Sequence, residues 1–283
     1  MSSVMHLKAG LCLWVCVSAV SAAQSPTRIA SADLCADAYV FALAEAEHVR
    51  AVSWQAGQTV SSAPEWALEL PRASGDAERL IGLGADLIVF GPAGAGDAAS
   101  LLDRAGLAHL SLQWGETLHS VTGNLTLLGE ALGREADVQN RIETLENRRD
   151  ALSARAEARG MSPSVFYLSV TGGAAGAGTL VDEAIRLAGG RNAATDAGGE
   201  GWLPANAEWA FRVNPDLIVT SYFVDGYATR SNIGARHAAF QRLLEGRPRI
   251  DVPASAWSCA GPALMDAAEQ IADALDQIAG PNG

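Results

Sequence analysis

The residues best suited to chemistry in this 283-residue sequence are two cysteines, Cys35 and Cys259, near opposite ends of the chain. In an oxidising compartment such a pair is first interpreted as a possible disulfide, which requires Cα atoms within about 7 Å of each other. Two thiolates could instead coordinate the metal of a bound complex. Two unpaired, inert thiols are the third possibility. The sequence leaves these three states open, and titration of free thiols separates the first from the others.

Three tryptophans form a second group of candidate site residues. Trp54, Trp202 and Trp257 each fall near a predicted strand end or in a loop that contains glycine or proline. In α/β folds, ligands bind outside the carboxyl ends of the strands. Large aromatic side chains at that edge suit a flat or bulky apolar ligand, so we expect these three to line a cleft. The tryptophans expected to pack in the core are Trp66, Trp114 and Trp209.

Patterns typical of enzymes are missing or incomplete. The sequence has no Gly-x-Ser-x-Gly motif and no histidine pair with metal-ligand spacing. Residues 94–99 imitate a dinucleotide fingerprint but do not follow the first strand. The glycine-rich residues 172–178 lack the Gly-Lys-Ser/Thr ending of a phosphate loop, and we expect a turn that lines a cleft there. The sequence therefore favours a binding protein without an intrinsic cofactor over an enzyme.

A spaced repeat indicates which elements position these residues. Ala77-Glu78, seven residues and then Asp86-Leu87-Ile88-Val89 recur half a chain later as Ala207-Glu208, seven residues and Asp216-Leu217-Ile218-Val219. Each copy is typical of a short helix that precedes a buried parallel strand. Two copies predict two similar α/β lobes with a ligand cleft between them.

The remaining pattern agrees with a parallel sheet in each half of the chain. Strands are expected at residues 28–31, 49–54, 86–90, 108–112, 164–168, 216–221 and 249–252, and helices alternate with them. Between the halves, residues 134–159 have helical spacing, which predicts a helix roughly 39 Å long that acts as a stiff connector. The predicted fold class is α/β, with two lobes of mainly parallel sheets joined by a single long rigid helix.

The predicted domain boundaries follow from this arrangement. They are a signal peptide at 1–23, an N-terminal lobe at 24–133, a connector helix at 134–160 and a C-terminal lobe at 161–283.

The first 23 residues have the features of a cleaved secretory signal peptide. Lys8 precedes an apolar run over residues 11–20, and Ser21-Ala22-Ala23 supplies small residues for cleavage. Neither Cys12 nor Cys16 follows the small residues that a lipoprotein signal requires, so we expect a periplasmic protein without a direct membrane anchor. The formal net charge of −12 argues against binding to nucleic acid or to an anionic membrane.

Five segments carry a family resemblance. They are Ser31-Ala32-Asp33-Leu34-Cys35-Ala36-Asp37, Gly178-Thr179-Leu180-Val181-Asp182-Glu183, Ala188-Gly189-Gly190-Arg191-Asn192, Asn214-Pro215-Asp216-Leu217-Ile218-Val219 and Trp257-Ser258-Cys259-Ala260-Gly261-Pro262. With these segments and the mid-chain helix, the chain resembles the periplasmic substrate-binding proteins of ABC importers for cobalamin, ferric siderophores and haem, which form class III of the binding proteins. The resemblance covers about residues 28–279 and implies two α/β lobes whose closure is small.

The resemblance also implies a partner. In such proteins one glutamate on each lobe docks onto arginines of the membrane permease dimer, and Glu78 and Glu208 stand at the matching positions. The internal repeat singles out the same two residues. The alternative for each is a carboxylate in the first turn of a helix, where its charge is favourable.

The expected ligand is a small-molecule metal complex held between the lobes. The assigned ligand-binding residues are Asp33, Cys35, Trp54, Trp202, Tyr222, Trp257 and Cys259. The sequence has no arginine cluster near the predicted strand ends that could hold an anionic chelate. The favoured ligand is therefore a corrinoid or another neutral, apolar-faced complex, ahead of a ferric siderophore or haem. The alternative is an exported enzyme or chaperone that modifies or inserts a cofactor on the same scaffold. Neighbouring genes for a permease and an ATPase would separate the two.

Overall fold

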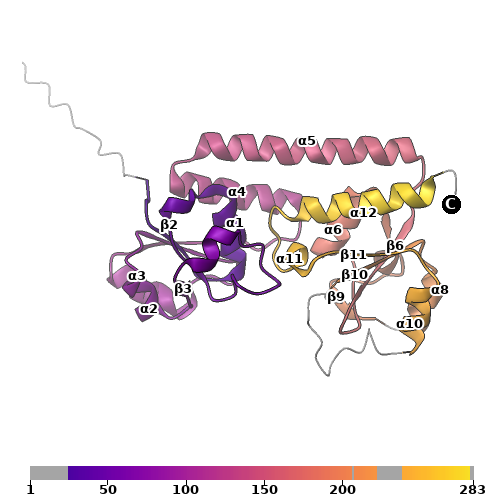
Figure 1. Ribbon diagram of the computed structural model, residues 1–283, viewed down its shortest axis with the longest axis horizontal. Coiled ribbons are helices and arrows are strands. Elements are labelled where there is room, and N and C mark those ends of the chain that lie inside the picture. Colours follow the sequence, from indigo (N-terminus) through magenta and orange to yellow (C-terminus); the bar gives the residue numbers. More distant parts are fainter. Residues whose placement is uncertain (1–24, 206, 222–237, 281–283) are drawn as a thin grey trace, which may run out of the picture.

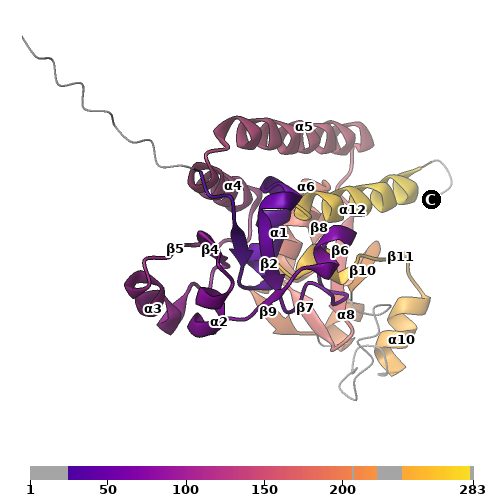
Figure 2. The same cartoon turned by 60° about the vertical axis from the view of Figure 1, so that its left-hand side comes forward.

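Two parallel sheets, one in each half of the chain, form the framework of the molecule (Figure 1). The computed structural model describes residues 25–205, 207–221 and 238–280. The predicted fold class is confirmed, because each half has its own parallel sheet and a single long helix runs over both (Figures 1 and 2). The domain boundaries given above stay a prediction.

The N-terminal lobe is built on a five-stranded sheet with the order β3-β2-β1-β4-β5, in which all neighbours are parallel. Its strands are β1 (Ile29–Ser31), β2 (Val49–Ser53), β3 (Arg72–Ala73), β4 (Leu87–Phe90) and β5 (Ala108–Ser111). Its α-helices are α1 (Leu34–Leu43), α2 (Ala77–Gly82), α3 (Ala99–Arg104) and α4 (Leu118–Leu132). Three short 3₁₀ helices are η1 (Ala46–His48), η2 (Glu65–Glu69) and η3 (Gly96–Ala98).

The C-terminal lobe is built on a four-stranded parallel sheet with the order β11-β10-β6-β8. Its strands are β6 (Ser164–Ser169), β8 (Arg191–Asn192), β10 (Leu217–Ser221) and β11 (Arg249–Asp251). A separate antiparallel pair joins β7 (Gly173–Ala175) and β9 (Trp202–Pro204). The helices are α6 (Leu180–Leu187), α7 (Ala193–Asp196), α8 (Ala207–Val213), α10 (Ala238–Glu245), α11 (Ala254–Trp257) and α12 (Leu264–Ala279).

The sequence repeat is a structural duplication. In the first copy, the carboxylate of Asp86 accepts a hydrogen bond from the backbone N–H of Arg28 at 2.9 Å, while the N–H of Asp86 donates to the carbonyl of Arg28 at 2.8 Å. In the second copy, Asp216 forms the same two bonds with Ser164, both at 2.8 Å. Each aspartate therefore fixes the start of a central strand pair, β1 with β4 and β6 with β10. The strands that follow are fully buried, as parallel strands covered on both faces are.

The predicted connector is α5 (Glu135–Arg159), a helix of 25 residues. Its buried residues Val138, Leu145 and Leu152 recur every seven positions and face one hydrophobic cluster that extends through both lobes. Gly133 and Gly160 end α4 and α5 with left-handed backbone angles, φ 65° and 67°, which glycine adopts without a steric penalty.

Ion pairs with the same seven-residue spacing fix α5 against α12. Arg148 binds Glu269 at 2.7 Å, and Arg155 binds Asp276 at 2.6 Å. Because both partners advance by seven residues, the two helices run parallel in a defined register. The hydrogen bond from Arg148 lowers the pKa of the Glu269 carboxyl, so this pair stays charged to acidic pH. At its other end α5 holds the N-terminal lobe, where Arg141 donates to the carbonyl of Ala42 at 2.7 Å.

The lobes also exchange helix caps. Leu118, the first residue of α4, donates its N–H to Glu183 of the C-terminal lobe at 3.2 Å. Leu180, the first residue of α6, donates to Glu116 of the N-terminal lobe at 2.8 Å. Burial raises the pKa of the Glu116 carboxyl, and the hydrogen bond from Leu180 opposes that rise. Each lobe thus supplies a carboxylate to the positive end of a helix in the other.

A disulfide joins the lobes covalently. Cys35, at the start of α1, is bonded to Cys259, which follows α11, with the two Cα atoms 5.2 Å apart. Of the three states that the sequence left open, the structure therefore has the first, and these sulfurs are not thiolates that could coordinate a metal. Beside the disulfide, the hydroxyl of Tyr39 donates to the carbonyl of Ala260. Burial raises the pKa of Tyr39 to about 12, so this donor keeps its proton.

The disulfide generates a prediction about thiols and stability. Unfolded, unreduced protein without residues 1–23 should contain no titratable thiol. Replacing Cys35 and Cys259 together by serine should lower the free energy of unfolding by about 2–5 kcal/mol, because the unfolded chain regains the freedom that the cross-link removes. Guanidinium denaturation measures the change. Reductant should bring the wild-type midpoint down to that of the double variant and leave the variant itself unaffected; two thiols in the unreduced wild type would contradict the prediction.

Candidate ligand-binding cleft

A cavity of about 650 Å³ opens beside the carboxyl end of β6 in the C-terminal lobe. Its lining comes from the end of β6, the β6–β7 turn, β7, β9 and α11. The lining residues are Tyr167, Ser169, Val170, Thr171, Gly172, Gly173, Ala174, Trp202, Leu203, Pro204 and Trp257. None of these described lining residues is charged. The volume suits a small-molecule ligand, and the strand ends are where α/β sheets bind ligands.

Three aromatic rings form the floor and rim of this cavity. The ring of Tyr167 lies edge-to-face with Trp202 and with Trp257, with centroids 5.9 Å apart in both pairs. Tyr167 is buried and Trp257 is only 6% exposed, whereas Trp202 is 56% exposed. Trp202 therefore presents an apolar face to a ligand, and the other two hold it in place.

Both cleft tryptophans of this lobe lie on regular elements rather than in loops, and both are near strand ends, the other position that the sequence allowed. Trp202 begins β9 and pairs with Ala175 of β7, which fixes its backbone. Trp257 ends the short helix α11. The predicted turn at residues 172–178 likewise contains β7, although residues 172–174 do line the cavity as expected.

The indole nitrogen of Trp257 is a buried donor with no hydrogen-bond partner among the described residues. A buried N–H without an acceptor is unfavourable by roughly 1–3 kcal/mol. Trp257 contributes to the cavity wall, but its indole nitrogen is itself buried below the surface of that wall.

Trp54 is the predicted ligand-binding tryptophan of the N-terminal lobe, and it lies at the carboxyl end of a strand. It follows β2 directly, and its side chain is largely exposed. The end of β2 is fixed by Asp37, whose carboxylate accepts from the N–H of Ser53 at 3.0 Å and from its hydroxyl at 2.6 Å. Burial raises the pKa of the Asp37 carboxyl, against the opposing effect of the serine hydrogen bonds. Asp37 is a positioning residue, and no local sequence pattern predicts its contact with Ser53.

Asp33 lies at the same edge, but its carboxylate is engaged by the backbone. It accepts from the N–H groups of Cys35 and Ala36, both at 3.0 Å, and so caps α1. It also accepts from Gly91, which follows β4, at 2.6 Å. A Cβ atom at Gly91 would collide with this carboxylate, so only glycine permits the contact. The structure thus gives Asp33 a structural role, and its contact with a ligand stays a prediction.

The expected core position of Trp114 was wrong. Its side chain is 78% exposed, in the loop that follows β5 and only two residues before the interlobe contact of Glu116. Trp66 and Trp209 do pack, against Phe41 and Phe166 with centroids 5.7 and 5.4 Å apart, although Trp66 stays partly exposed. Aromatic identity alone does not separate a core tryptophan from one at a sheet edge.

Among the other assigned residues that the structure describes, none lines this cavity. Cys259 lines a second cavity of about 410 Å³ between α1, α5 and the segment before α12, which we call the rear cavity. Glu78 lies exposed in the first turn of α2, away from the cleft. Glu208 lies in α8, but its side chain is outside the described part of the structure, as is the whole of Tyr222.

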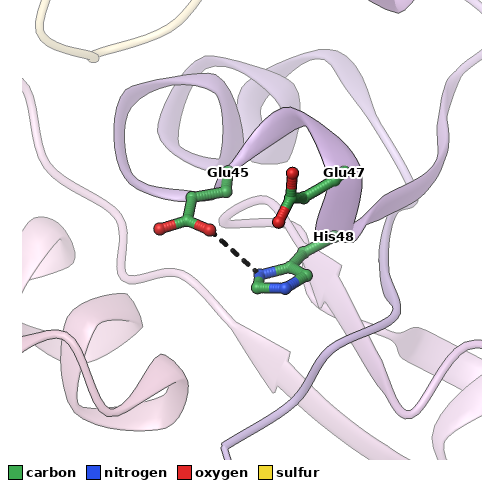
Figure 3. A group of neighbouring side chains, drawn as sticks. All are labelled: Glu45, Glu47 and His48. Atoms are coloured by element: carbon green, nitrogen blue, oxygen red, sulfur yellow. Dashed lines mark ion pairs between the residues drawn. The ribbon is translucent and has the colours of Figure 1, made fainter.

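A group of acidic and histidine side chains lies at the surface around η1. Glu45, Glu47 and His48 lie close together at the surface (Figure 3). Glu45 already faces His48 at 3.9 Å and Arg134 at 3.2 Å, so its charge is compensated.

Among the helices of the described residues, none has the length and apolar character needed to cross a membrane.

Two α/β lobes, a long helix across both and an aromatic cavity at the strand ends define a two-lobed ligand-binding protein. Residues 30–231 match the family described as periplasmic binding protein, and the chain belongs to that family.

Individual relatives are more distant. The chain is 23% identical over 207 residues to the ABC transporter substrate-binding lipoprotein YvrC of Bacillus subtilis (strain 168), and the match spans 70% of this chain but only 64% of that relative. The apo periplasmic heme-binding protein RhuT of Roseiflexus sp. RS-1 superposes with a TM-score of 0.71 at 22% identity, covering 89% and 99% of the two chains. The vitamin B12 binding protein BtuF of Vibrio cholerae gives 0.67 at 22% identity, covering 90% and 99%.

The unequal burial of the two cavity tryptophans generates a second prediction. Trp257→Ala should lower the free energy of unfolding by about 3–5 kcal/mol, because it leaves a large void beside Tyr167. Trp202→Ala should lower the free energy of unfolding only by the contribution of one edge-to-face contact plus at most about 0.5 kcal/mol. Denaturant unfolding of both variants measures this, with the exposed Trp114→Ala as the matched control. Equal losses for Trp202 and Trp257 would contradict the assigned roles.

Proposed function

We propose that this protein is the substrate-binding component of an ABC importer and that it captures a metal complex with a flat, apolar face in the aromatic cavity of the C-terminal lobe. The described lining comes from that lobe alone, and a contribution of the N-terminal lobe to an interlobe cleft stays a prediction. The observation that carries the proposal is the uncharged aromatic cavity formed by Tyr167, Trp202 and Trp257. Family membership supports the general role, and the similarity to binding proteins for heme and vitamin B12 and to an ABC transporter lipoprotein supports the ligand class and the partner. Family membership also argues against the enzyme alternative.

Within that class, a corrinoid fits the described lining best. A haem or an anionic siderophore calls for a basic side chain, and a haem also for an axial histidine or tyrosine, but the described lining contains neither arginine nor histidine. Its one tyrosine, Tyr167, is buried beneath the two tryptophans. A corrinoid instead offers an extended apolar face that can lie against the exposed ring of Trp202.

A periplasmic location is part of the proposal. The family description and the lipoprotein relative support a place outside the cytoplasm. The finer proposal of a freely diffusing protein rests on the sequence, because neither Cys12 nor Cys16 follows the small residues that lipid attachment requires.

Docking to a permease through Glu78 and Glu208 is the proposed route of delivery. The two residues occupy equivalent places in α2 and α8, one on each lobe. A pair of similar sites on one chain suits a permease whose two halves are related by a two-fold axis. The exposure of Glu78 supports this role, since a carboxylate that docks must be accessible.

The ligand is tested by titrating the protein with cyanocobalamin, hemin and a ferric hydroxamate siderophore by calorimetry. Cyanocobalamin should bind most tightly. Trp202→Ala should weaken its binding by about 1–3 kcal/mol, or roughly 5- to 150-fold in Kd, because it removes a stacking surface. Trp66→Ala, outside the cavity, is the matched control. Tighter binding of hemin or the siderophore would exclude the corrinoid, and failure of all three to bind would exclude a metal complex of these kinds.

Docking is tested by reversing charge on both lobes at once. Glu78→Arg combined with Glu208→Arg should abolish binding to the cognate permease–ATPase complex in lipid nanodiscs and leave cyanocobalamin affinity unchanged, because the changes lie on the docking surface and not in the cavity. The control is Glu143→Arg combined with Glu157→Arg, which reverses two exposed charges on α5. Wild-type affinity of the first double variant for the permease would remove the docking role.

A further inference from the structure

The two copies of the repeat share an exposed apolar side chain that the proposed docking role does not use. Ile81 in α2 is 40% exposed and Phe211 in α8 is 44% exposed. Each stands three residues after the glutamate of its own copy, Glu78 or Glu208. The rest of the two helices differs, since one reads Ala-Glu-Arg-Leu-Ile-Gly and the other Ala-Glu-Trp-Ala-Phe-Arg-Val.

This position is not required for folding. In α2, Ala77 and Leu80 are the buried residues, so the core face of the helix lies on another side from Ile81. In α8, Trp209 is the residue that packs on the sheet, with its ring 5.4 Å from that of Phe166. A single exposed apolar side chain on a surface is ordinary. The same position kept apolar and exposed in both lobes, on helices that pack differently, points to a shared external contact.

The geometry places both side chains where a single partner can reach them. Residues three apart on a helix are neighbours on its surface, so each apolar side chain lies on the face that carries the glutamate position. Figures 1 and 2 show α2 and α8 on the side of the molecule away from α5, one on each lobe. A partner with two similar contact sites on a common face can therefore engage both lobes together.

We propose that Ile81 and Phe211 are apolar anchors of the permease-docking surface, each of which enters an apolar recess beside the arginine that binds the neighbouring glutamate. The inference rests on the proposed docking of Glu78 and Glu208 and adds a second component to it. An apolar contact next to an ion pair excludes water, which strengthens the charge interaction. The occupant is a permease dimer, because two duplicated anchors on one chain match two equivalent recesses.

Charge argues against a second copy of this chain as the occupant. The protein carries a net charge of −12, and this overall charge makes two copies repel each other. The exposed first turn of α2 holds Asp76 beside Glu78, which adds to that repulsion. A partner with basic side chains around its recesses avoids this cost and is attracted instead.

The test replaces each anchor by a small polar residue and measures affinity for the cognate permease–ATPase complex in lipid nanodiscs. Ile81→Ser and Phe211→Ser should each weaken the complex about tenfold, as loss of an interface anchor does. The double variant should lose roughly the product of the two, because the lobes contact separate halves of the permease. Cyanocobalamin affinity and the thermal unfolding midpoint should match those of the wild type. Met161→Ser, at an exposed apolar residue that follows α5, is the matched control.

The outcomes separate this inference from the docking role itself. Wild-type affinity of both serine variants, together with loss of binding in the glutamate double variant, would overturn the anchors and leave docking by the glutamates intact. No effect from either set would overturn both. Analytical ultracentrifugation of the free protein adds a third readout: a wild-type dimer that the serine variants convert to monomer would assign these side chains to self-association and overturn the proposal.

Discussion

The matched register of α5 and α12 is the constraint on which the rest of the molecule depends. Buried side chains and arginine pairs both recur every seven residues along α5, so apolar packing and charge specify the same alignment. Each ion pair lies at the surface and contributes little alone. Together with the shared hydrophobic cluster, these ion pairs specify one alignment of the C-terminal lobe against α5. The exchanged caps and the disulfide add further contacts at the junction of the two lobes.

Duplication explains the scaffold but not the binding surface. Asp86 and Asp216 fix equivalent strand pairs, and α2 and α8 are equivalent helices. The aromatic cavity, in contrast, belongs to one lobe and depends on the antiparallel pair β7 and β9, which has no counterpart among the described strands of the other lobe. The duplicated features therefore suit the proposed two-fold permease, whereas the cavity is built by one lobe.

The sequence predicted the features that depend on long or repeated patterns. The apolar strands at Leu87–Phe90 and Leu217–Ser221 and the helix Glu135–Arg159 were identifiable because burial and helical period leave regular traces. The β7–β9 pair was not, because Gly173–Ala175 has no strand propensity and its pairing is decided by tertiary contact. The core position predicted for Trp114 was wrong for a related reason. The exposure of a side chain depends on what packs against it in the folded protein, and no local sequence pattern indicates this. The engaged carboxylates of Asp33 and Asp37 likewise acquire their partners only in the folded chain.

The separation of the bonded cysteines has a consequence for the order of events during synthesis. The cross-link spans 224 positions, so it encloses most of the 283-residue chain. In a polypeptide that crosses a membrane N-terminus first, Cys35 emerges early and stays a free thiol until Cys259 arrives. The first sheet can therefore be complete well before the bond can form. Correct oxidation thus reports that the chain has emerged through Cys259, which lies just before α12.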